Sequence, residues 1–132
     1  IDYGTKRIGI AVCDELHISC NPIKTIDIEK ENLKDELSQI IIKERISAVV
    51  IGLPISYDDT ENTLITKIKS FAEFIKKEFS FDIYYIDESY SSKNASDYMV
   101  EYGIKKSNRV KKGTIDKFAA VIILQRFLQE ME

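Results

Sequence analysis

The chain of 132 residues is 44% apolar and 10% aromatic, which is enough for one compact domain with a buried core but leaves no room for a second. Its formal net charge of −3 argues against a protein that coats nucleic acid without specificity. No apolar stretch approaches the roughly 20 residues of a membrane span, and the start lacks the apolar block of a signal peptide, so we expect a soluble, cytoplasmic protein.

The opening of the chain predicts three strands. Ile1-Asp2 has the pattern of the tail of a strand, and we expect an N-terminus that is clipped ahead of it. Residues 8–13 are apolar and β-branched, and residues 18–28 carry a weaker extended pattern after a short polar turn. These segments predict an antiparallel hairpin that continues from the first strand.

Helices and strands alternate in the rest of the chain. The patterns predict a helix over 31–45, a strand over 47–53, a helix over 61–79, a strand over 81–87, and helices over 92–102 and 115–130. The order βββαβαβαα indicates an α/β fold with a mixed sheet and helices on both faces, as a single domain over 1–132.

Cys13, His17 and Cys20 could supply three zinc ligands from one short segment. A fourth ligand is not apparent, and the segment fits two strands joined by a turn. We therefore expect two reduced, buried thiols beside a surface histidine.

Residues 104–117 form a basic stretch with six cations and one acid, so this segment carries +5 and leaves −8 for the remainder of the chain. The cations are Lys105, Lys106, Arg109, Lys111, Lys112 and Lys117. Such a stretch suits contact with nucleic-acid phosphates, although a solvated loop has the same composition.

The segment from Asp2 to Gly9 sets a carboxylate at a strand end and follows it with a turn that holds two glycines and two cations. Gly4 and Gly9 lack the Cβ that would block close approach to a phosphate, and Lys6 and Arg7 supply positive charge. The alternative is an ordinary hairpin whose glycines satisfy turn geometry.

Three further acids, Asp87, Glu88 and Asp116, lie near the predicted ends of elements. Alternation in the strand over 81–87 puts Asp87 and Glu88 on opposite sides, so only one of them can point into a given site. Asp116 is expected in the first turn of the last helix, where the helix dipole alone would favour an acid.

Strand ends and a helix N-terminus converge at one edge of an open α/β sheet, so Asp2, Asp116 and one acid of the Asp87-Glu88 pair are expected to meet there. Two carboxylates about 4 Å apart repel by roughly 4 kcal/mol at an effective dielectric of 20. A divalent cation reverses that cost, and all-oxygen ligands favour Mg²⁺ or Mn²⁺ over zinc. Such ions can activate a water and stabilise a leaving oxygen, which predicts cleavage of phosphodiester bonds.

Four motifs in order along essentially the whole chain resemble the YqgF (RuvX) family of Holliday-junction-resolvase-like nucleases. They are the run from Asp2 to Val12, the run from Val50 to Pro54, the Asp87-Glu88 pair, and the run from Ile115 to Ala120 that leads into Ile123-Leu124-Gln125. The resemblance implies a ribonuclease H-like fold, a five-stranded sheet ordered 3-2-1-4-5, and a site built from Asp2, Glu88 and Asp116 as catalytic and metal-binding residues.

The resemblance also implies a metal-dependent endonuclease that trims the 5′ end of precursor small-subunit ribosomal RNA, with precursor ribosomal particles as a partner. Two positions depart from the family pattern, because Ser89 and Thr114 stand where basic residues are usual. The candidate substrate-binding residues are Gly4, Lys6, Arg7, Ser91, Arg109, Lys111 and Lys112.

Three other functions fit parts of the sequence. Resolvases that cut four-way DNA junctions have the same fold, so branched DNA is an alternative substrate. A weakly active or noncatalytic ribosome-associated factor would keep the fold and the basic stretch. The turn from Asp2 to Gly9 also resembles the phosphate loop of actin-like ATPases and sugar kinases, but those proteins need two copies of the fold and this chain has length for one.

Overall fold

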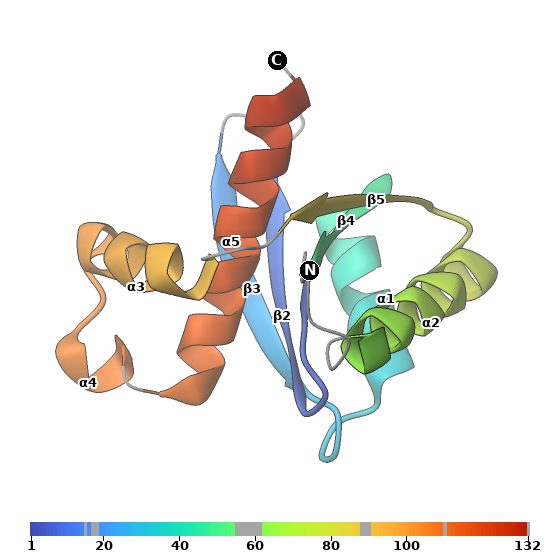
Figure 1. Ribbon diagram of the computed structural model, residues 1–132, viewed down its shortest axis with the longest axis horizontal. Coiled ribbons are helices and arrows are strands. Elements are labelled where there is room, and N and C mark those ends of the chain that lie inside the picture. Colours follow the sequence, from blue (N-terminus) through green and yellow to red (C-terminus); the bar gives the residue numbers. More distant parts are fainter. Residues whose placement is uncertain (15, 17–18, 55–61, 88–90, 110, 132) are drawn as a thin grey trace.

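The computed structural model describes residues 1–14, 16, 19–54, 62–87, 91–109 and 111–131 (Figure 1). Within them the elements run in the order β1 (Asp2–Tyr3), β2 (Arg7–Cys13), β3 (Cys20–Asp27), α1 (Leu33–Glu44), β4 (Ala48–Leu53), α2 (Asn62–Phe79), β5 (Asp82–Asp87), α3 (Ser91–Tyr102), α4 (Lys106–Arg109) and α5 (Lys112–Met131). The predicted mixed α/β class is confirmed. None of the helices in these ranges is both long and apolar enough to cross a bilayer.

The strands pair in two hydrogen-bonded groups among the described residues. β1, β2 and β3 form an antiparallel group in that order, with Asp2 opposite Gly9. β4 and β5 form a parallel pair in which Leu53 lies opposite Asp87. The five-stranded order 3-2-1-4-5 is therefore not what the hydrogen-bonded ladders give. Two backbone bonds nevertheless link the groups, from the Ile1 ammonium to the Val50 carbonyl (2.7 Å) and from the Gly52 N–H to the Ile1 carbonyl (3.1 Å).

The helices divide between the two faces of the strands, as Figure 1 shows, with α5 crossing β2 and β3 on one side and α1 and α2 lying apart from it. The main core lies on the α1 and α2 side, where Ile8 of β2 is fully buried with Leu37 of α1 and Ile68 of α2. A smaller core forms where α3 packs on α5, around Met99 and Phe118. Removing these apolar side chains from water is the main force that holds both layers.

The ends of α1 follow local capping rules. The Asn32 side chain accepts a hydrogen bond from the Asp35 N–H at 3.0 Å, which satisfies one of the free amides of the first turn. Arg45 ends the helix in the left-handed conformation, with φ of 54°. The helix predicted over 31–45 is confirmed, two residues shorter at its start.

α2 is the amphipathic helix that the sequence predicts over 61–79. Its buried face carries Ile68, Phe71, Ala72 and Ile75, while its lysines are exposed. Phe71 also contacts the ring of Tyr3 at a centroid distance of 5.0 Å, so this helix packs directly on the end of β1.

The C-terminal helices differ from the prediction. α3 ends at Tyr102 and is followed by Gly103, whose φ of +86° suits glycine. The short helix α4 was not foreseen, and α5 begins at Lys112 instead of residue 115. Gly113 therefore lies inside the helix. A Cβ there would make only ordinary contact with Thr25 (3.5 Å), and the Thr25 hydroxyl donates to the Gly113 carbonyl, so packing against β3 outweighs the low helix propensity of glycine.

Candidate active site

Asp2 and Asp116 lie on the same face of the strands because of Gly9. Gly9 is directly opposite Asp2, and side chains at directly opposed positions share a face. A Cβ on Gly9 would lie 2.0 Å from the Asp116 carbonyl oxygen and 2.3 Å from its carbon, so the backbone of α5 rests on β2 at this point. The structure thus brings together two of the three predicted carboxylates from opposite ends of the chain.

Arg7 binds Asp116. Its Nε donates to the Asp116 Oδ2 at 2.8 Å, and the two side chains are 34% and 23% exposed. Arg7 lies two residues before Gly9 on β2, on the same face, so the cation, the α5 contact and Asp2 occupy one corner. This arginine was predicted to bind substrate phosphate. In the structure it offsets the charge of a site carboxylate, a role that the sequence did not indicate.

The position of Asp116 in its helix corrects one expectation. Because α5 begins at Lys112, Asp116 lies beyond the first turn, and that turn holds no acid. Helix-dipole stabilisation falls off within the first turn, so the dipole does not account for an acid at this position. The ion pair with Arg7 is the contact that does.

The two tyrosines of β5 identify which helix each face of that strand meets. Tyr84 contacts Phe127 of α5, with ring centroids 5.4 Å apart, whereas burial and then the nearby Glu73 of α2 raise the pKa of Tyr85. Tyr84 therefore faces α5 and Tyr85 faces α2. Asp87 is two residues beyond Tyr85 and shares its face, opposite to that of Asp116. Glu88, the third predicted carboxylate, lies outside the described residues.

Arg126 contacts the end of β5, which the sequence did not predict. It extends from α5 and its Nη1 donates to the Asp87 carbonyl at 3.0 Å, which ties the C-terminal end of β5 to the helix that carries Asp116. Its sequence context, near the end of an apolar helix, gives no signal for such a contact.

The glycines of the first turn have structural explanations. A Cβ on Gly4 would lie 2.6 Å from the Arg7 carbonyl oxygen, so the turn itself requires glycine there. Gly9 meets the backbone of α5, so close approach of a phosphate does not explain it. Lys6 is exposed, and its carbonyl accepts from the Ile28 N–H at 3.0 Å. Substrate binding by Gly4 and Lys6 stays a prediction.

The basic stretch lies directly before Asp116 in the fold. Lys106 and Arg109 bound α4, Lys111 is exposed, and Lys112 opens α5 one helical turn before Asp116. The exposed Lys106 and Lys111 therefore lie in the segment that leads into the helix of Asp116. Ser91, the remaining predicted contact, opens α3.

The two thiols lie side by side across the hairpin. Cys13 and Cys20 are directly opposed on β2 and β3 and are not joined by a disulfide. Cys20 is buried as predicted, whereas Cys13 is half-buried. Burial, and to a lesser extent the neighbouring Cys13, raises the pKa of Cys20 to about 11, which favours the thiol over the thiolate that zinc requires. His17 lies outside the described residues.

The described residues fit part of a metal site. Asp2 and Asp116 are hard oxygen donors on one face, the donor type that Mg²⁺ and Mn²⁺ prefer. In the part of the chain that the structure describes, no group of three or more His, Cys, Asp or Glu side chains is suited to a metal. Glu88 is not among the described residues. The set of three carboxylates stays a prediction.

Comparison with known proteins gives a family match over nearly the whole chain. The family described as "RuvX: Holliday junction resolvase" matches residues 1–130. A protein of Amoebophilus asiaticus is 38% identical over 129 residues, covering 97% of this chain and 90% of the relative. Relatives from Chlorobium luteolum (35% identical, 98% and 92% covered) and Legionella pneumophila strain Lens (34%, 99% and 94%) are similar over the same extent. Each of the three is named "Putative pre-16S rRNA nuclease".

Proposed function

The chain belongs to the RuvX family, and on that basis we propose that it is a nuclease that hydrolyses phosphodiester bonds of nucleic acid, acting on precursor 16S ribosomal RNA. The observation that carries the proposal is the meeting of Asp2 and Asp116 on one face, where Gly9 lets α5 rest on β2. The names of the relatives support the choice of substrate. The family description supports a four-way DNA junction as the second candidate substrate.

Asp2, Glu88 and Asp116 would hold one or two Mg²⁺ or Mn²⁺ ions. Asp2 and Asp116 share the α5 face, and Asp87 is on the opposite face, which leaves Glu88 as the acid of the pair that alternation assigns to the α5 face. When bound, such ions activate a water and stabilise the leaving oxygen.

The cations around the carboxylates would orient the substrate. Lys105, Lys106 and Lys111 are exposed in the stretch that leads into α5, where they can contact the backbone phosphates of a nucleic acid. Gly4, Lys6, Ser91, Arg109 and Lys112 are the other proposed contacts. Thr114, which stands where a basic residue is usual in the family, is half-buried and donates its N–H to the Lys111 carbonyl (3.1 Å), so we assign it no phosphate.

For the fold, we propose the ribonuclease H-like order 3-2-1-4-5, with β1 in the middle. The Ile1 amine and carbonyl bond the residues on either side of Ile51, which is the pattern of a parallel pair between β1 and β4. A cavity of about 980 Å³ extends from this point between the edges of β2 and β4. Its lining includes Val12 of β2, Val49 of β4, Leu37 and Ile41 of α1, and Leu124 and Leu128 of α5. The apolar lining contributed by both strands supports a position of β1 between β2 and β4.

This order can be tested by lengthening β1. Four apolar residues of high strand propensity joined ahead of Ile1 should fill the cavity and raise the free energy of unfolding by about 2 kcal/mol or more, because apolar burial outweighs the cost of ordering the added residues. A Gly-Ser-Gly-Ser extension of equal length is the control. Equal stability of the two extended proteins, measured by urea denaturation, would contradict the central position of β1.

The proposed activity is tested by incubating the purified protein with precursor 16S ribosomal RNA, a linear RNA without the processing site, and a DNA four-way junction. Each substrate is given Mg²⁺, Mn²⁺ or a chelator. We expect cleavage of the precursor that requires a divalent cation and is lost in Asp2→Asn and Asp116→Asn. Preferred cutting of the junction would move the assignment to the second candidate. Cleavage that persists in chelator, or binding of the precursor without cleavage in any metal, would contradict a metal-dependent nuclease.

A further inference from the structure

Arg7 binds one of the two oxygens of a carboxylate that would hold the proposed metal. Its Nε lies 2.8 Å from the Asp116 Oδ2, and a carboxylate oxygen that accepts an N–H at this distance has that lone pair committed. Because the Asp116 backbone is packed against Gly9, both cations would meet its carboxylate in the same corner. The guanidinium and a cation held by Asp116 therefore compete for the same side chain.

The corner also explains why an arginine would be useful there before metal binds. Asp2 lies opposite Gly9, and Asp116 lies against Gly9, so two negative charges share one face. Arg7 supplies the opposite charge from the same strand, and at 34% exposure its side chain is open enough to solvent to leave the carboxylate. The pair joins residues 109 positions apart, so it also ties the first hairpin to the last helix.

We propose that Arg7 is a displaceable counter-ion of Asp116. It holds the carboxylate in position while no metal is bound, is released when a divalent cation takes the Asp116 oxygen, and then turns to a phosphate of the substrate. This inference rests on the proposed metal site at Asp2 and Asp116 and adds a positioning role for Arg7 to it. The substrate-binding role predicted for Arg7 and its observed ion pair then belong to two states of the same side chain.

The first test measures Mn²⁺ affinity by titration calorimetry. Arg7→Gln should tighten Mn²⁺ binding about fivefold, since a partly exposed ion pair of this kind no longer competes. Lys6→Gln is the matched control, because it removes the same charge from the adjacent, exposed residue and should change the affinity less than about twofold. In an Asp116→Asn background, Arg7→Gln should have no effect. Unchanged or weaker Mn²⁺ binding in Arg7→Gln would overturn the proposal.

The second test uses the wild-type chain and does not depend on the folding of a variant. The Arg7 Nε–H signal in a nitrogen–proton NMR spectrum should be slow to exchange with water in metal-free protein, and should shift and exchange faster as Mg²⁺ is added. A signal that is unaltered at saturating Mg²⁺ would contradict displacement. At saturating Mn²⁺, Arg7→Gln should also raise KM for the precursor RNA about fivefold. The same substitution would then weaken the use of RNA while it tightens the binding of Mn²⁺.

The outcomes separate this inference from the proposed function. If the wild-type protein binds neither Mg²⁺ nor Mn²⁺, the proposed metal site is wrong, and there is no cation to displace Arg7 from Asp116. If it binds metal through Asp116 but Arg7→Gln leaves the affinity unchanged, the nuclease proposal stands and only the role of Arg7 is wrong.

Discussion

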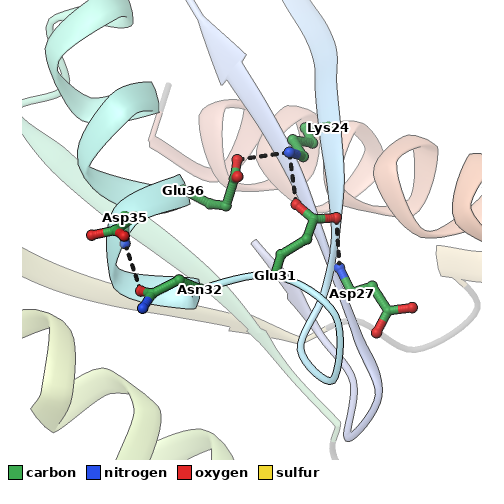
Figure 2. Close-up of polar contacts among 6 residues, drawn as sticks. All are labelled: Lys24, Asp27, Glu31, Asn32, Asp35 and Glu36. Carbon is green, nitrogen blue, oxygen red and sulfur yellow. Dashed lines mark hydrogen bonds and ion pairs between the residues drawn. The ribbon is translucent and has the colours of Figure 1, made fainter.

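Two clusters of cations and carboxylates in this molecule have similar chemistry and different settings. In the Lys24 cluster, Lys24 lies 2.7 Å from the Glu31 Oε2 and 2.6 Å from the Glu36 Oε2 (Figure 2). Its partners are at most 12 residues away, so it fastens the β3–α1 connection to the strand before it. The Arg7–Asp116 pair instead joins the two ends of the chain at a place where a second acid, Asp2, shares the face.

An ion pair indicates a functional site only when the neighbouring charged residues have no structural role that explains them. The Lys24 cluster closes a local turn, with the Asp27 N–H also donating to the Glu31 Oε1 at 3.4 Å and Asn32 capping the helix beside it. Glu31 and Glu36 therefore both have a structural task there. At the Arg7 corner, backbone packing fixes Asp116 beside Asp2, an arrangement that costs free energy unless a cation is present. We therefore expect changes in the Lys24 cluster to alter stability alone and changes at the Arg7 corner to alter activity.

The largest expected difference is in catalysis. Asp116→Asn keeps the shape of the side chain but removes its charge, so kcat/KM for the precursor RNA should fall at least about 1000-fold, or roughly 4 kcal/mol of transition-state stabilisation. Glu36→Gln makes the same chemical change in the Lys24 cluster and should leave kcat/KM within about twofold of wild type. Similar losses in both variants would remove the distinction between the clusters.

The next largest effect concerns the backbone contact that forms the corner. Gly9→Ala places a Cβ 2.0 Å from the Asp116 carbonyl oxygen, so α5 must move and the free energy of unfolding should fall by about 3 kcal/mol or more. Gly113→Ala is the matched control on the α5 side of the same packing layer, where the Cβ meets Thr25 of β3 at 3.5 Å. It should be neutral or stabilise by up to about 1 kcal/mol, since alanine favours the helix. Urea denaturation of both variants decides the point, and equal stabilities would show that α5 does not rest on Gly9.

The smallest effect is the pH dependence of the Lys24 cluster. Hydrogen bonding to Lys24 lowers the pKa of Glu31, while Glu31 and then Glu36 raise the pKa of Lys24. The stabilisation from Glu31 is therefore full above its unfolded pKa and is lost as the pH falls through its lowered value in the folded state. Lys24→Met should cost up to about 1 kcal/mol at pH 7, because the cluster is partly exposed, and the cost should shrink below pH 4. A cost that stays constant from pH 7 to pH 3 would contradict this origin.

Much of the fold followed from the sequence, because apolar periodicity reports which side of an element is buried. The strand predicted over 8–13 and the helix predicted over 61–79 are found there, with Ile8 and Ile68 buried. The start of α5 was missed because Gly113 and Thr114 read as a turn. Packing against Thr25, a residue 88 positions away, keeps them helical. The ladders that define the strand order depend on long-range hydrogen bonds, which periodicity does not encode.

The candidate site was predicted only in part for the same reason. Asp2 and Asp116 could be named from their places at element ends, but their meeting depends on Gly9, which the sequence presented as a turn or phosphate-loop glycine. Asp116, the partner of Arg7, is 109 residues away in the sequence, and no local pattern predicts this ion pair. The residue pattern left Asp87 and Glu88 open and only the family resemblance named Glu88, because the pattern does not report which face of β5 meets α5. The contact of Tyr84 with Phe127 supports the choice of Glu88, which stays a prediction.

That choice offers the most direct test of the site. Asp87→Asn and Glu88→Gln are compared for Mn²⁺ affinity and for cleavage of precursor 16S ribosomal RNA, with circular dichroism to verify that each variant is folded. If the metal lies on the α5 face with Asp2 and Asp116, Glu88→Gln should lose metal binding and cleavage, whereas Asp87→Asn should keep both within a few-fold of wild type, because Asp87 faces α2. Loss of metal binding and cleavage in Asp87→Asn, with Glu88→Gln unaffected, would contradict the account.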